Sequence, residues 1–79
     1  MKHYKLSDEV LRTHLSANVF YRTDDENTLH TCVAIGKNKV KPWAAIEDFD
    51  IPLDLSDCTL ISKSYFNERY EYAIDLNSY

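Results

Sequence analysis

The two side chains best suited to covalent chemistry are His30 and Cys32, which stand two residues apart. On a β-strand, residues i and i+2 share a face, so the histidine could activate the thiol as a nucleophile. A working site also needs a group that orients the histidine and an oxyanion site, and the sequence indicates neither. Cysteine is among the most buried residue types. We therefore interpret Cys32 as a core residue and expect no enzymatic activity, with a small Cys/His enzyme as the alternative.

The residues that could ligate a metal are scattered along the chain. They form no CxxC pair and no histidine pair at helical spacing. The acids from Glu47 to Asp57 do not match a calcium loop, because the glycine at its sharp turn is missing and Ile51 to Leu53 interrupt the ligand positions. We expect no metal and no other cofactor. The scattered residues are His3, His14, His30, Cys32 and Cys58.

Composition excludes further classes. The single glycine, Gly36, rules out the glycine-rich loops that bind nucleotides. No apolar run approaches the roughly 18 residues of a membrane span, and residues 1–16 do not resemble a signal peptide. Two cysteines could form at most one disulfide. We therefore expect a cytoplasmic protein that does not associate with membranes.

Aromatic strands beside Lys37, Lys39 and Lys41 could stack bases next to a basic groove. The formal net charge of −4 disfavours direct binding to nucleic acid, because phosphate contacts supply most of the non-specific affinity. Aromatic residues on strands are expected to form core instead.

The charge is unevenly distributed. Residues 1–46 carry seven Lys or Arg and five acids, whereas residues 47–79 carry two and eight, giving −6 for this part alone. Ten aromatic residues are more than so small a core can hold. Exposed Tyr and Trp beside carboxylates are typical of protein interfaces, and an acidic surface attracts a basic partner. The predicted partner-binding residues are Trp43, Glu47, Asp48, Asp50, Asp54, Asp57, Tyr65, Glu68, Tyr70, Glu71 and Tyr72.

The first expected element is a helix from Ser7 to Ser16. Ser7 is a suitable N-cap, and Asp8 and Glu9 favour the first turn of a helix. A helix this short must pack on a sheet to be stable. Residues 1–6 could form a short edge strand or a loose arm.

A β-hairpin is predicted from Ala17–Thr23 and Thr28–Ile35, with the polar cluster at residues 24–27 as its turn. In the second arm, alternate residues from Leu29 to Ile35 share an apolar face. Gly36 is expected to end that arm.

The middle segment is ambiguous. Pro42 followed by Ala and Glu favours a short helix over residues 42–49. A third strand from Val40 to Ile46 is the alternative, with Pro42 at a sheet edge. Residues 51–57 are expected to form an extended connection.

The stretch Cys58–Leu76 is predicted to be a second hairpin folded about Asn67 and Glu68. From Tyr70 to Leu76, large apolar residues alternate with polar or small ones, which is the period of a half-buried strand. The register is open, because a two- or four-residue turn pairs Tyr65 with Tyr70 whereas a three-residue loop pairs Phe66 with Tyr70.

Together these elements predict one compact α+β domain over residues 1–79. Its N-terminal helix would pack on an antiparallel sheet of about four strands that ends in a C-terminal β-hairpin. The expected function is non-enzymatic binding of another protein with a basic surface, through the acidic, tyrosine-rich half. A structural homodimer without a dedicated ligand is the alternative.

In size and acidity the chain is similar to the small inhibitors that phages and other mobile elements carry, anti-CRISPR and anti-restriction proteins among them. That similarity implies an inhibitor of a nucleic-acid-binding protein. If the partner normally holds nucleic acid, the carboxylates of the acidic surface predicted here could occupy its phosphate positions.

Overall fold

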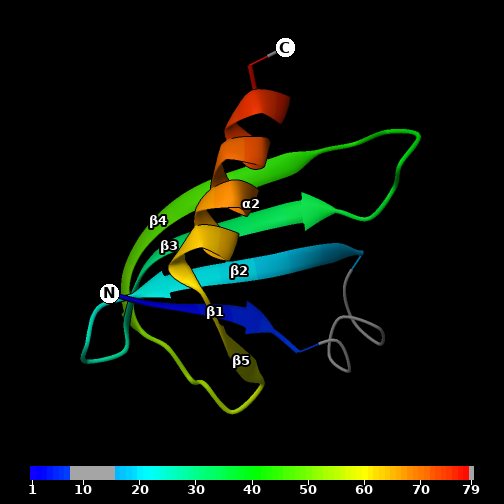
Figure 1. Cartoon of the computed structure of the whole chain (residues 1–79). Coiled ribbons are helices and arrows are strands. Elements are labelled where there is room, and N and C mark those ends of the chain that lie inside the picture. The colour runs from blue at the N-terminus through cyan, green and yellow to red at the C-terminus, as the bar shows by residue number, and fades with distance from the viewer. Residues whose placement is uncertain (8–15, 79) are drawn as a thin grey trace.

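The computed structural model describes residues 1–7 and 16–78. Within these ranges the chain forms an antiparallel sheet of five strands and a helix near its C-terminus (Figure 1). The elements are β1 (Lys2–Leu6), β2 (Ala17–Thr23), β3 (Thr28–Gly36), β4 (Ala44–Pro52), β5 (Cys58–Ile61) and α2 (Lys63–Leu76).

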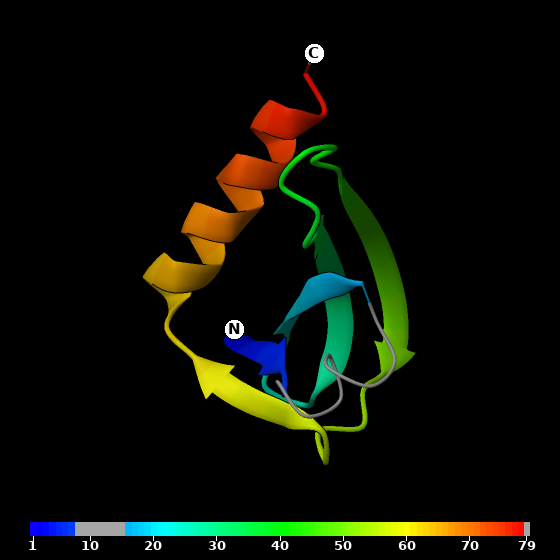
Figure 2. The same ribbon diagram turned by 90° about the vertical axis from the view of Figure 1, so that its right-hand side faces the viewer.

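The strand order across the sheet is β4-β3-β2-β1-β5, and every neighbouring pair is antiparallel. Strands β1 to β4 follow one another as a meander, whereas β5 returns to pair with the free side of β1. The edges of the sheet are therefore β4 and β5. The sheet is strongly curved, and α2 lies across one of its faces (Figure 2).

The first predicted hairpin is confirmed. Strands β2 and β3 pair from Ala17 opposite Gly36 to Thr23 opposite Leu29. Every second residue of β3 is buried, from Leu29 to Ile35, as the alternation predicted. The turn between the strands has Asn27 at φ 63°, a left-handed conformation that Asn tolerates better than most residues.

The predicted C-terminal hairpin is wrong, because residues 63–76 form a helix. Ser62 caps it by accepting a hydrogen bond from the N–H of Tyr65 at 3.1 Å. Phe66, Tyr70 and Ala73 recur at helical spacing and face the sheet, and the supposed hairpin tip at residues 67–68 lacks a glycine for a tight turn.

The predicted fold class needs correction in its arrangement as well. The helix that packs on the sheet is C-terminal, not N-terminal, and the sheet has five strands rather than about four. The expected helix from Ser7 to Ser16 falls mainly on residues 8–15, which lie outside the described residues. The α+β class and the antiparallel sheet are confirmed.

The middle segment is a strand, so the preference for a helix over residues 42–49 is wrong. Strand β4 starts at Ala44, later than the alternative strand predicted from Val40, and continues to Pro52. Pairing with β3 and contact of Ile46 with the core outweigh the local helical signals of Pro42 and the alanines.

The core lies between α2 and the sheet. It contains Phe20, Val33 and Ile35 from the sheet and Phe66 and Ala73 from the helix. The two helical residues are seven positions apart, which is two turns, so one stripe of α2 supplies the contact.

Candidate functional site

Strand β4 has a neighbour on one side only, among the strands that the structure describes. The N–H of Gly36 donates to the carbonyl of Trp43 at 2.9 Å, so the main chain of Trp43 points toward β3. Along an antiparallel strand, the main-chain N–H and C=O groups of successive residues point alternately to one side and to the other. The N–H and C=O groups of Ala44, Ile46 and Asp48 therefore point away from the sheet, along a free edge.

The same edge is strongly acidic. Glu47, Asp48 and Asp50 are exposed carboxylates on β4, and Asp54 and Asp57 follow in the connection to β5. Residues 44–62 contain no Lys, Arg or His. Over the described ranges 1–7 and 16–78, none of these five carboxylates forms an ion pair.

The register places these carboxylates on both faces of the sheet. Asp48 lies opposite Thr31, which shares the face under α2 with Arg22. Glu47 lies opposite Cys32, on the other face. In the following loop, the N–H of Ser56 donates to Asp54 Oδ1 at 2.9 Å, and the hydrogen bonds from Ser56 lower the pKa of this carboxyl.

Trp43 lies immediately before β4, with its indole ring against Gly36. A Cβ atom built on Gly36 would lie 2.2 Å from the indole Nε1, so only glycine fits beneath the ring. The side chain remains 44% exposed. This contact explains why position 36 is a glycine, and it holds a large aromatic side chain at the start of the acidic strand β4.

The predicted site residues on α2 form a separate group. Tyr70 is partly buried: its ring stacks on Phe66 with centroids 6.2 Å apart, and the guanidinium of Arg22 lies 5.5 Å from its centroid. Tyr65 and Tyr72 are seven residues apart and share another face of the helix. Tyr65 meets Phe20 edge-on with centroids 5.7 Å apart.

Arg69 contacts both an aromatic ring and a carboxylate on the surface of α2. Its guanidinium lies 5.1 Å from the Tyr72 ring centroid, and its Nη2 contacts Glu68 Oε1 at 2.8 Å. Glu71 is exposed. The structure thus divides the predicted residues between the β4 edge with its following loop and the helix α2.

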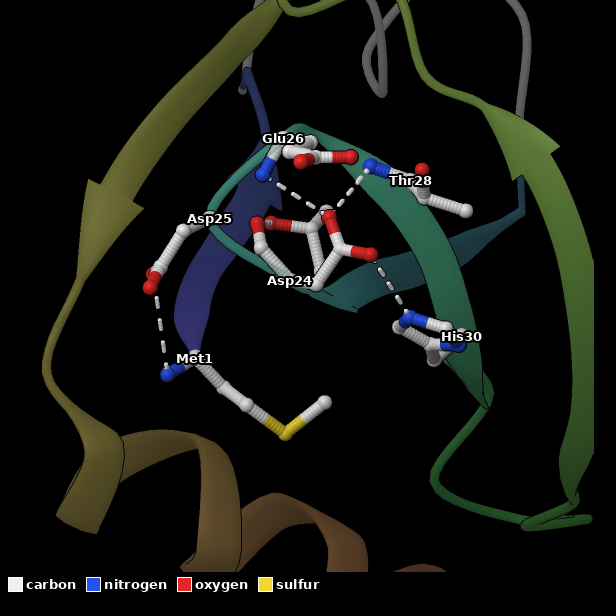
Figure 3. A network of polar contacts seen from close by, with 7 residues as sticks. Met1, Asp24, Asp25, Glu26, Thr28 and His30 are labelled. Carbon is white, nitrogen blue, oxygen red and sulfur yellow. Dashed lines mark hydrogen bonds and ion pairs between the residues drawn. The ribbon is translucent and has the colours of Figure 1, made fainter.

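His30 pairs with a carboxylate of the β2–β3 turn. Its Nε2 lies 3.1 Å from Asp24 Oδ2 (Figure 3). The other carboxylate oxygen, Asp24 Oδ1, accepts hydrogen bonds from the main-chain N–H groups of Glu26 and Thr28 at 2.9 and 3.0 Å. The bond from Thr28 is the main cause of the lowered pKa of Asp24, and His30 adds to it. Asp24 therefore organises the β2–β3 turn and binds the histidine.

The environments of the two thiols raise their pKa values. Burial raises the pKa of Cys32 to about 11, and the nearby Glu47 carboxylate adds to the effect. Burial also raises the pKa of Cys58, with Asp57 and Asp54 contributing. Both cysteines are free thiols. Their environments oppose formation of the reactive thiolate.

Sequence reasoning missed a group of polar residues beneath α2. His3 is 5% exposed, and its ring centroid lies 5.1 Å from that of Phe66. Burial lowers the pKa of His3, followed by repulsion from Arg22, the N-terminal amine and Lys63. Arg22 also donates to Thr31 Oγ1 at 3.0 Å. The alternation of β2 could have indicated that Arg22 shares a face with Phe20.

The described residues contain no group of three or more His, Cys, Asp or Glu side chains placed to hold a metal ion. In the same part of the chain, no helix is both long and apolar enough to cross a membrane. A scan of protein-family models, a search of curated proteins and a search of solved structures each found no match.

Proposed function

We propose that the protein is a non-enzymatic binding module that docks the acidic β4 edge onto a basic surface of another protein. The observation that carries the proposal is the combination of a free sheet edge with Glu47, Asp48 and Asp50, in a stretch from 44 to 62 without a cation. Unpaired carboxylates increase the rate of encounter with a basic partner and select against acidic ones.

The charge density of β4 suggests what such a partner normally binds. Residues 47–50 span roughly 10 Å of strand and carry three negative charges. One strand of a DNA duplex carries one charge per about 3.4 Å of axis, which is a similar density. We propose that the partner is a nucleic-acid-binding protein, that the carboxylates occupy phosphate positions, and that the chain acts as an inhibitor of the kind that mobile elements carry.

The thiol environments support a non-enzymatic role, because the raised pKa values of Cys32 and Cys58 disfavour a nucleophile. Two free cysteines also fit a reducing compartment, so we assign the protein to the cytoplasm within this proposal.

Two triple variants of equal charge test the proposed surface. The edge variant carries Glu47→Gln, Asp48→Asn and Asp50→Asn. The helix variant, its matched control, carries Glu68→Gln, Glu71→Gln and Asp75→Asn. Each changes the formal net charge from −4 to −1, since −4 + 3 = −1.

Each variant and the wild type are used to capture proteins from the native host at low and high salt. We expect a basic nucleic-acid-binding partner to be captured by the wild type and the helix variant and lost with the edge variant. Added DNA or RNA should release it from the wild type. Equal capture by the edge variant and the wild type in the same salt range contradicts the proposal.

An exposed leucine on strand β5, Leu60, favours a homodimer as the second candidate function. Strand β5 is the other edge, has no charged residue, and carries Leu60 at 67% exposure. Pairing β5 with a second copy would cover this leucine. Molar mass measured across concentrations tests it: a stable dimer at low micromolar that Leu60→Lys converts to monomer supports this candidate, and a persistent wild-type monomer opposes it.

A further inference from the structure

We infer that β4 binds its partner by strand addition, taking an extended segment rich in Lys or Arg as the sixth strand of the sheet. This inference rests on the proposed function and specifies how the acidic edge makes contact. Strand addition uses main-chain hydrogen bonds for affinity and flanking side chains for specificity.

The main chain of β4 is arranged for such pairing. The groups of Ala44, Ile46 and Asp48 that point outward alternate with those of Ala45 and Glu47 that face β3. The strand has nine residues, and its stretch Ala44–Asp48, roughly 16 Å of edge, pairs with β3 without a register shift. An incoming segment could therefore pair over several residues without disturbing any hydrogen bond within the sheet.

Charge selects the occupant. Glu47 on one face and Asp48 on the other would flank an added strand, so basic side chains on either face find a carboxylate. A second copy of this chain does not fit the edge, because antiparallel pairing of two β4 strands would place Glu47, Asp48 and Asp50 against the same residues. Like charges on edge strands also oppose self-association.

The end of α2 adds to the negative potential at this edge. Figure 1 shows α2 crossing the strands and its C-terminus lying beyond β4, and the two elements are in contact. The last turn contains no basic residue. The C-terminus of a helix carries a partial negative charge, which favours a cationic segment alongside.

Two synthetic peptides of identical charge test the inference. The first is an acetylated and amidated nonapeptide in which Lys and Val alternate. The second is N-methylated at its central Lys and the adjacent Val, so that both edges lose a donor and gain a steric block. Alternation makes the peptide nearly symmetric, so it can pair in either direction.

We expect the unmodified peptide to bind the wild type and the helix variant, and to bind at least tenfold more weakly when N-methylated. Binding should slow hydrogen exchange at the amides of Ile46 and Asp48, while those of Ala45 and Glu47 stay unchanged. The edge variant should bind the unmodified peptide more weakly than the helix variant does.

Equal affinities for the two peptides, or unchanged exchange at Ile46 and Asp48, would overturn strand addition and leave the acidic surface as a side-chain contact. Absence of binding by the unmodified peptide up to about millimolar concentration would overturn it as well. Failure of the proposed function is recognised separately, by equal capture of host partners by the wild type and the edge variant.

Discussion

Replacing Gly36 with alanine should displace the only tryptophan of the chain. The new methyl group would lie 2.2 Å from the indole Nε1 of Trp43, whereas ordinary contacts are 3.4–4 Å, so the ring must move by at least about 1.2 Å. Two further ring atoms lie within 2.6 Å of the same point. The ring therefore cannot keep its position.

The cost follows from the area that the ring loses. Trp43 is 44% exposed, so about 56% of its surface is covered, or roughly 140 Å² of a side chain of about 250 Å². Losing half of this cover exposes about 70 Å², which corresponds to about 1.8 kcal/mol. For a domain of this size, that lowers the melting temperature by roughly 7–14 °C.

Thermal and urea unfolding followed by circular dichroism measure this change, and the tryptophan emission of Gly36→Ala should shift to longer wavelength. The control is the same substitution in a Trp43→Ala background. There the clash is absent, and alanine in a strand should be neutral or stabilising by up to about 1 kcal/mol. A neutral effect of Gly36→Ala in the wild-type chain would refute the contact between Trp43 and Gly36.

Three further changes test the fold and the thiol chemistry. Phe66→Ala removes a fully buried ring and should cost about 3–5 kcal/mol in urea unfolding, against a total stability of roughly 4–12 kcal/mol; a loss below 1 kcal/mol would contradict the packing of α2. The stability of the wild type should fall as the pH drops below 6.5, because His3 becomes protonated in the unfolded chain but, with its lowered pKa, not in the folded chain. Melting curves at pH 7 to 5 should show a weaker pH dependence for His3→Gln. A variant whose melting temperature changes with pH as steeply as that of the wild type would contradict this role of His3. Because its pKa is raised from 9.0 to about 11, the Cys32 thiol should be ionised roughly 100-fold less at pH 8 in the native protein than after denaturation. Alkylation of a Cys58→Ser variant, in which Cys32 is the remaining thiol, measures this difference. Equal alkylation rates for the native and the denatured protein would exclude the environment described for Cys32.

The first hairpin was predictable because its signals are local and agree. Alternate burial from Leu29 to Ile35 and the polar turn after Thr23 were correctly inferred from the sequence. Residues 63–76 were not, because their aromatic residues satisfy two periods at once. The strand pattern would have buried Tyr72 and Ile74, which the helix leaves 40% and 43% exposed.

Strand β4 shows how pairing at long range overrides local preference. The sequence from Pro42 favours a helix, yet Ala44–Pro52 pairs with β3 and Ile46 contacts the core. The acidic composition of this segment was evident from the sequence. Its place at a free edge was not, because that depends on β5 pairing with β1 rather than with β4.

The position of Trp43 against Gly36 also depends on register. Neither residue predicts the other locally, since they are joined by pairing of β3 with the residue before β4. Likewise, His3 and Arg22 lie beneath the helix only because β1 and β2 are neighbours.

Chemical shifts of the isotope-labelled protein, recorded while the unmodified lysine–valine peptide is added, test the central claim most directly. If β4 is the docking edge, the largest changes occur within Ala44–Pro52 and the last turn of α2, and they are absent from the edge variant. If the largest changes occur instead along Cys58–Ile61 or at the β2–β3 turn, the free edge of β4 is not where this protein binds.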